Sequence, residues 1–311
     1  MFKKFYKIKK KINFISIFFH MYIKMDDHLL QRIRNNDPSL TNINLCDGQV
    51  GDEGMIKLSD TLKVNTSITM INLSDNQIGP EGMEKLAKVL KFNTSITTIY
   101  LSWNQIGDEG VKTLAEALKV NTSITMINLS WNQIGDEGMK ALAEALKVNT
   151  SIKYIDLSCN QIGNEGMKKL SEAIKVNSSI KYISLFNNKI GSEGMVSLAE
   201  ALKVNTSITN IFLYDNQIGP EGLKILIDAL QYNYIIEYIG IYDNSGNIKE
   251  LLKPKNRKQR IIEWMPWKNH HICIKLEPRF HDIVLTLLYL FFIPQIFLRR
   301  EKQRLRQQKK F

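Results

Sequence analysis

An asparagine returns every 28 residues along most of this chain. The positions are Asn76, Asn104, Asn132, Asn160, Asn188, Asn216 and Asn244. Each asparagine lies in a segment with the same apolar spacing, which around Asn76 is formed by Ile68, Ile71, Leu73 and Ile78. A fixed period of this length is typical of a solenoid, in which every coil buries its apolar face against the next coil. We therefore expect the chain to fold by stacking coils rather than around one large core.

One repeat unit, residues 68–95, predicts a short strand followed by a helix. Ile71 and Leu73 alternate with outward positions, which is the two-residue period of a strand with one buried face. Residues that favour a helix start follow at position 80 and its equivalents, which are Asp52, Asp108, Asp136, Asn164, Ser192 and Pro220. Apolar residues then recur at helical spacing. We expect the asparagine between strand and helix to bind loop carbonyls of the neighbouring coil through its amide.

A strand that returns to a parallel strand through a helix is right-handed in nearly all proteins. The sequence therefore predicts an α/β solenoid shaped like a horseshoe, with parallel strands on the concave face and helices on the convex face. About eight 28-residue coils are expected over residues 41–248. A helix within residues 25–40 is expected to cap the first coil, because Leu29, Leu30 and Ile33 recur at helical spacing.

The repeat resembles the leucine-rich repeats of the ribonuclease-inhibitor type, which NOD-like receptors and tropomodulin-like proteins share. The resemblance covers roughly residues 41–244, and the first coil departs from it, since Gly48 stands where an asparagine is expected. It implies an intracellular scaffold or regulator that binds a protein partner on its concave face. Residues 33–40 also resemble the start of the tropomodulin repeat domain, so an actin-regulatory role is one alternative. A ribonuclease-inhibitor-like role is another, although the many cysteines of that family are missing.

Large aromatic residues gather on the expected concave face from the middle coils onward. Such residues are favoured anchors for partners, and nearby aspartates add negative charge. The alternative interpretation is that the aromatic residues only stabilise neighbouring strands. We expect a protein segment with basic and apolar side chains to bind at Trp103, Trp131, Tyr154, Asp156, Tyr182, Phe186, Phe212, Tyr214, Asp215, Tyr238 and Tyr242.

The sequence predicts no enzyme, no cofactor and no metal. No histidine lies between Met55 and Asp243, so the concave face lacks the usual proton-transfer residue. His270, His271 and Cys273 are too few and too close for a metal site. Triplets that match the glycosylation acceptor pattern start at Asn65, Asn93, Asn121, Asn149, Asn177 and Asn205. Their regular spacing favours a structural role in the loops instead.

Charge separates the ends of the chain from its body. Residues 41–248 carry 17 Lys and Arg against 23 Asp and Glu, whereas residues 1–24 carry 7 against none. Residues 249–311 carry 16 against 5. The chain is basic in total, but no repeated stripe of Lys or Arg is expected on the coils, so nucleic acid is not an expected partner.

The two ends are interpreted separately. Residues 1–24 resemble the basic and apolar parts of a signal peptide but lack a cleavage site, and Met25 is an alternative start. Residues 249–311 are expected to form a basic helical segment. Its apolar run 283–298 is shorter than the roughly 20 residues of a spanning helix, so we expect it to pack on the solenoid or dock a partner. A membrane anchor is the alternative, and three scattered cysteines favour a cytoplasmic protein.

Overall fold

The computed structural model describes residues 25–242, 262–265 and 271–274. The helices within these ranges are α2 (Asp27–Arg34), α3 (Gly51–Leu62), α4 (Pro80–Leu90), α5 (Gly107–Leu118), α6 (Asp136–Val148), α7 (Asn164–Val176), α8 (Ser192–Val204) and α9 (Gly219–Leu230). The strands are β1 (Asn42–Asn44), β2 (Met70–Asn72), β3 (Thr98–Tyr100), β4 (Met126–Asn128), β5 (Tyr154–Asp156), β6 (Tyr182–Ser184), β7 (Asn210–Phe212), β8 (Tyr238–Tyr242), β9 (Ile262–Met265) and β10 (His271–Ile274).

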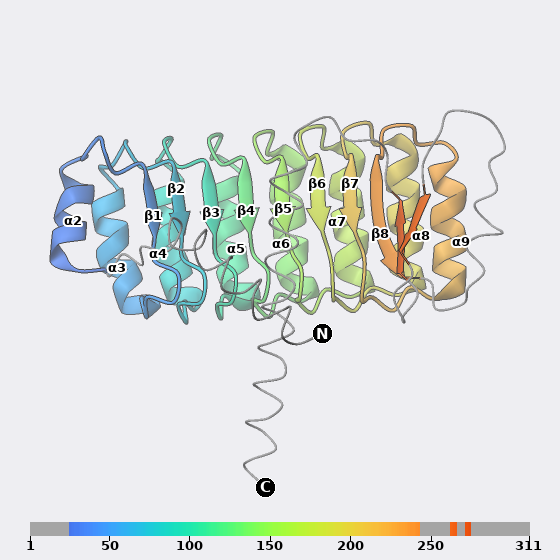
Figure 1. Ribbon diagram of the computed structural model, residues 1–311, viewed down its shortest axis with the longest axis horizontal. Helices are drawn as coiled ribbons and strands as arrows, with labels where there is room; N and C mark the ends of the chain where they lie inside the picture. Colours follow the sequence, from blue (N-terminus) through green and yellow to red (C-terminus); the bar gives the residue numbers. More distant parts are fainter. Residues whose placement is uncertain (1–24, 243–261, 266–270, 275–311) are drawn as a thin grey trace, which may run out of the picture.

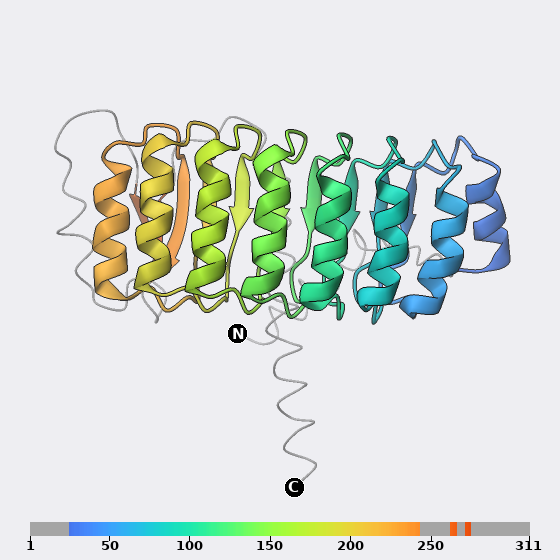
Figure 2. The same cartoon turned by 180° about the vertical axis from the view of Figure 1, so that it is seen from behind.

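The strands β1 to β8 form one parallel sheet in sequence order (Figure 1). Neighbouring strands pair with a shift of 28 residues, so that Ile43 lies beside Ile71 and Ile71 beside Ile99. The same isoleucine column continues to Ile239 in β8. The helices lie side by side on the other face of the sheet (Figure 2). The predicted α/β solenoid is therefore confirmed.

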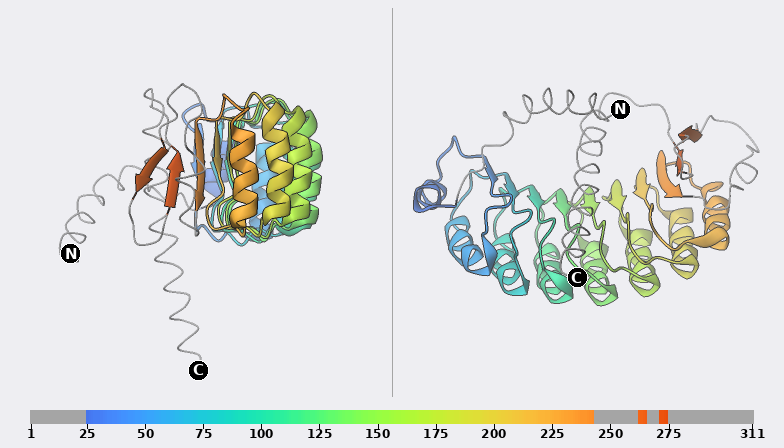
Figure 3. Two further views of the ribbon diagram at one scale, coloured as in Figure 1. Left: turned by 90° about the vertical axis from the view of Figure 1, so that its right-hand side faces the viewer. Right: turned by 60° about the horizontal axis from the view of Figure 1, so that its bottom comes forward.

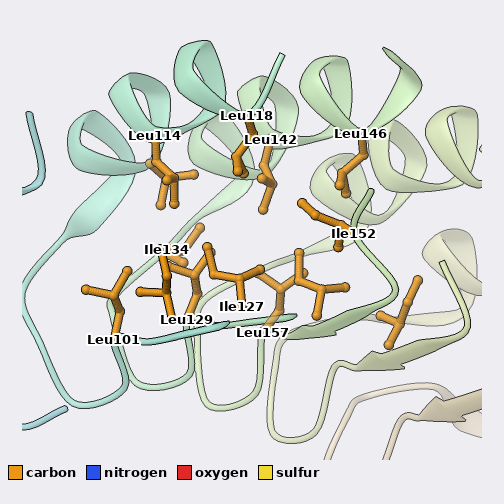
Figure 4. Close-up of a cluster of buried hydrophobic side chains, with 14 of the residues drawn as sticks. Leu101, Leu114, Leu118, Ile127, Leu129, Ile134, Leu142, Leu146, Ile152 and Leu157 are labelled. Atoms are coloured by element: carbon orange, nitrogen blue, oxygen red, sulfur yellow. The ribbon is translucent and has the colours of Figure 1, made fainter. Parts of the chain in front are cut away.

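The stack is curved, with the strands on the inner side and the helices on the outer side (Figure 3). Strands in a sheet lie about 4.8 Å apart, whereas packed helices need about 8–10 Å, so regular stacking of such coils must bend. The core fills the space between the two layers. Leu114 and Leu142 of the helices meet Ile127 and Leu157 of the strand side there, and all four are fully or almost fully buried (Figure 4).

The repeating asparagines join each coil to the coil before it. The side-chain oxygen of Asn104 accepts hydrogen bonds from the backbone N–H groups of Asn76 and Ile78, at 3.1 and 2.9 Å. Its side-chain nitrogen donates to the carbonyl oxygens of Leu73 and Leu101, both at 2.9 Å. One side chain therefore satisfies buried backbone groups in two successive loops, which no apolar residue could do.

A second asparagine row lies in the triplets that match the glycosylation pattern. The side-chain nitrogen of Asn149 donates to the carbonyl oxygens of Leu118 and Asn121 in the preceding coil, at 2.8 and 2.9 Å. Its side-chain oxygen accepts from the backbone N–H groups of Ser151 and Ile152. Asn149 is buried, as are the equivalent asparagines in the other described coils. The nitrogen that would carry a glycan is thus engaged in holding the coils together.

Side chains at the helix starts also cap the helix of the following coil. Asp108 accepts a hydrogen bond from the backbone N–H of Gly135 at 2.6 Å, and Gly135 has an extended backbone with φ of −102°. Pro80 occupies the equivalent position one coil earlier and offers no acceptor. There Gly107 adopts φ of +58° and its N–H donates to the Asn132 carbonyl instead. Glycine permits both the extended and the left-handed backbone. This explains why glycine stands at this position both in coils that the preceding side chain caps and in coils that it does not.

The C-terminal region differs from the expected helical segment in two places. β10 pairs antiparallel with β8, and β9 pairs antiparallel with β10. The alternation and β-branched residues of His271-Ile272-Cys273-Ile274 favour a strand, and pairing covers the edge that β8 would otherwise expose. The apolar run 283–298 and the leader 1–24 lie outside the described residues. Within the described residues, no helix has the length and apolar character needed to cross a membrane.

Candidate protein-binding surface on the concave face

The concave face presents the outward side chains of the parallel strands and of the loops that follow them. Tyr154 and Asp156 in β5, and Phe186 after β6, are half-buried there. The backbone beneath them is fixed by the parallel pairing of every coil, for example Ile155 with Ile183. These side chains are therefore held on a rigid support, which lowers the conformational entropy lost when a partner binds.

Trp103 and Trp131 form a stacked pair at the rim of this face. Their ring centroids lie 4.1 Å apart, with 12° between the ring planes. Both residues have φ of +59°, a left-handed conformation that bulky side chains rarely adopt. The same position is held by Cys159 in one other coil and by Asp47, Asp75, Asn187 and Asp215 in four, and Asp and Asn are residue types that tolerate this conformation well. Local backbone energy therefore disfavours the two tryptophans, and such strain is often found at functional sites.

Five other aromatic residues form one connected cluster across β5 to β8, and they are Tyr154, Tyr182, Phe212, Tyr214 and Tyr238. Ring centroids lie 6.0 Å apart for Tyr154 and Tyr182, and 5.0 Å apart for Tyr182 and Phe212. Phe212 lies 4.7 Å from Tyr238, whose hydroxyl oxygen is 2.8 Å from that of Tyr214. These contacts cross between strands, so the cluster also stabilises the sheet. The alternative structural interpretation of the aromatic residues therefore applies to part of this set.

Phe212 and Tyr214 were expected to be exposed anchors, and this expectation was wrong. Their exposed fractions are only 8% and 7%. Phe212 packs between Tyr182 and Tyr238. Tyr214 lies over Gly240 in the next strand, where a Cβ atom would collide with its ring. The ring thus lies directly over the glycine backbone. Asp215, by contrast, is exposed. The side chain of Tyr242 and all of Asn244 lie outside the described residues.

Asp156 lies at the centre of a short polar chain. Its carboxylate accepts hydrogen bonds from the Ser158 backbone N–H at 2.9 Å, from the Ser158 hydroxyl, and from the Asn128 side-chain nitrogen at 3.3 Å. The hydroxyl oxygens of Ser158 and Ser184 are 2.6 Å apart. Burial raises the pKa of Asp156 above its usual value, and the serine hydrogen bonds only partly offset this effect. Burial therefore disfavours the ionised form of this carboxylate, and a cationic group of a partner would stabilise it.

Replacing Asp156 with asparagine is expected to stabilise the free protein at neutral pH. Because the pKa is raised in the folded state, Asp156 favours folding at low pH, and this contribution is lost as pH rises through that pKa. Asn128 in the preceding coil shows that an amide accepts the two serine bonds, from the N–H and hydroxyl of Ser130. The variant would lose only the long 3.3 Å bond that the Asn128 side-chain nitrogen donates to Asp156. Chemical denaturation of the variant and the parent at several pH values measures the difference in their free energies of unfolding. A variant that is less stable than the parent at pH 7 would contradict the prediction.

The family model described as Leucine Rich repeat matches residues 36–59, 64–87, 92–115, 120–143, 148–171 and 176–199. The chain is a leucine-rich repeat protein. The strand and helix in each of its coils agree with the ribonuclease-inhibitor type expected from the sequence.

Two solved structures are similar to this leucine-rich repeat protein. Leiomodin-1 Actin-Binding Site 2 is 25% identical, with 45% of this chain and 80% of that chain covered and a TM-score of 0.41. The tropomodulin C-terminal domain of Caenorhabditis elegans is 19% identical, with 46% and 87% covered and a TM-score of 0.41. No curated protein matches the chain.

Proposed function

We propose that this leucine-rich repeat protein is an interaction scaffold that binds a protein segment on its concave face. The observation that carries the proposal is the stacked pair of Trp103 and Trp131. Both occupy left-handed positions that aspartate or asparagine fills in four other coils and Cys159 in one, so two bulky rings there cost local stability. Binding of a partner is a reason for such residues to be present, because tryptophan is enriched among residues that dominate binding energy.

The chemistry of the surface favours a segment that combines basic and apolar side chains. Tyr154 and Phe186 offer half-buried aromatic rings, and Asp156 carries a charge that burial disfavours. A lysine or arginine beside Asp156 would relieve that cost, and an adjacent apolar side chain would cover the rings. The role we propose is that of an intracellular scaffold or regulator without catalytic activity.

The test is selection of peptides on the immobilised full-length chain, followed by affinity measurement. We expect enrichment of segments in which lysine or arginine stands beside an apolar residue. The double variant Trp103→Asn/Trp131→Asn should weaken their binding at least about tenfold, since two anchors are lost. Its stability should change little, because asparagine suits the left-handed backbone and offsets the lost ring stacking.

A matched control is Phe92→Ala, which removes an aromatic ring that is 84% exposed and lies away from the concave face. This variant should bind the selected peptides like the parent. Equal binding by the parent and the tryptophan double variant would refute the proposed surface. The actin-regulatory and membrane-anchored alternatives stay predictions of the sequence, and co-sedimentation with actin filaments or with vesicles checks them.

A further inference from the structure

A row of exposed apolar side chains runs along the edge of the solenoid where the helices end. We call it the apolar ridge, and its members lie 28 residues apart. They have exposed fractions between 57% and 84%, and they are Val64, Phe92, Val120, Val148, Val176, Val204 and Tyr232. Each stands directly before one of the buried asparagines that join the coils.

The ridge is a continuous line because the backbone beneath it is bonded from coil to coil. Asn121 donates to the Asn93 carbonyl at 3.1 Å, Asn149 to the Asn121 carbonyl at 2.9 Å, and Asn177 to the Asn149 carbonyl at 2.9 Å. The residue preceding each asparagine therefore lies one coil from its neighbour. Single exposed valines are ordinary, but seven exposed apolar side chains in register along one edge are typical of an interaction surface.

Local structure does not explain the ridge. Valine has a lower helix propensity than lysine or glutamine and gains nothing at a solvated helix end. The residue type also changes within the row, to phenylalanine at 92 and tyrosine at 232, while the apolar character is kept. Simple copying of one repeat would have kept valine throughout. The apolar character itself is thus the common property of this position.

A row of lysines flanks the ridge, contrary to the expectation that the coils carry no repeated basic stripe. It consists of Lys63, Lys91, Lys119, Lys147, Lys175 and Lys203. Carboxylates three residues earlier neutralise at least four of them, as in the 2.6 Å pairs of Lys119 with Glu116 and Lys147 with Glu144. A border in which most lysines are paired with carboxylates does not favour nucleic acid or an anionic lipid surface, both of which need a large excess of positive charge.

We propose that a second copy of this chain covers the ridge, related by a two-fold axis through the middle coil. A second copy is the partner whose apolar side chains share the same spacing along the same curve. The seven positions are centred on Val148, so a two-fold axis there places Val148 against Val148 of the second copy. It places Val64 against Tyr232 and Phe92 against Val204, so that each large ring faces a small side chain. The lysine and carboxylate rows of the two copies can exchange partners across the border.

This arrangement leaves the concave face of both copies open, so it stands independently of the proposed function. The test is sedimentation velocity of the full-length chain from about 1 to 100 µM, a range in which transient dimers form. We expect a dimer whose dissociation constant rises at least about tenfold in the triple variant Val120→Lys/Val148→Lys/Val176→Lys, because like charges then meet at the axis. Lysine suits a helix C-terminus, so the variant should stay folded.

Two controls sharpen the test. Ile56→Lys/Val196→Lys adds lysines at exposed apolar positions outside the ridge, 46% and 44% exposed, and should leave the dimer intact. Val148→Cys should form a disulfide-linked dimer on mild oxidation, whereas Val204→Cys should not, because its proposed neighbour is Phe92. A chain that stays monomeric throughout, or a dimer that the triple variant does not weaken, would overturn the proposal. Monomers that co-sediment with vesicles of phosphatidylcholine and phosphatidylserine, and lose this binding in the triple variant, would assign the ridge to a lipid surface instead, since that variant leaves residues 283–298 unchanged.

Discussion

Replacing Asn104 with alanine is expected to lower the free energy of unfolding by about 3 kcal/mol, because several buried backbone groups lose their partners at once. The N–H groups of Asn76 and Ile78 would lose their acceptor, and the Leu73 carbonyl would lose a donor. Asn104 itself is 5% exposed, so water cannot readily replace the amide. Denaturant unfolding of the variant and the parent measures the difference.

The neighbouring residue provides the control for this prediction. Gln105 is exposed in the same loop, and Gln105→Ala should change the stability by less than about 0.5 kcal/mol. A loss below about 1 kcal/mol for Asn104→Ala would mean that water or a rearranged loop satisfies the freed groups, and the structural role assigned to the asparagine row would be wrong.

Replacing Ile127 with alanine is expected to cost about 3 kcal/mol, within the range found for cavities in close-packed cores. Ile127 is 1% exposed and lies beside Ile99 and Ile155 of the adjacent strands, so the cavity weakens two coil interfaces. Because each coil contacts mainly its neighbours, the stability of a solenoid is close to a sum of coil and interface contributions. A defect in the middle therefore separates the array into two shorter parts.

Ile43 offers a matched comparison at the end of the array. It is fully buried but has a strand neighbour only on one side among the described residues, at Ile71. Ile43→Ala should therefore loosen the first coil while the remaining coils unfold close to the parental midpoint. Hydrogen exchange followed by mass spectrometry distinguishes the two variants. Equal loss of protection along the whole chain in Ile43→Ala would contradict nearest-neighbour stability.

The sequence predicted the coils well because their information is local and repeated. Alternation around Ile71 indicated the strands, and the helical spacing of Met83, Leu86 and Leu90 indicated the helices, all of which are buried. A coil whose sequence departs from the pattern does not change the predicted fold, because the same pattern occurs in several other coils. The strands β9 and β10 lacked this support, because short apolar segments outside the repeat fit a helix or a strand equally well.

The candidate binding surface was less predictable because the exposure of its side chains depends on contacts between coils. Tyr214 has the position of an exposed concave residue, yet the missing side chain of Gly240 lets its ring lie flat against the next strand. Similarly, Asp108 looked like an ordinary helix-start residue, but its carboxylate serves the next coil at Gly135. Both effects join residues about one coil apart, and comparing each residue with those 26–28 positions later would have revealed them.

The reach of the asparagine side chains also has an evolutionary consequence. Asn104 binds only groups of its own loop and of the loop one repeat earlier, and Asn160 does the same with Leu129 and Leu157. If a whole 28-residue segment were excised or duplicated, the two coils brought together would have the same shape as before. The asparagine hydrogen bonds between them would then form again. Recombination between repeats can change the length of such a protein, and hence the length of its concave face, without requiring any new contact.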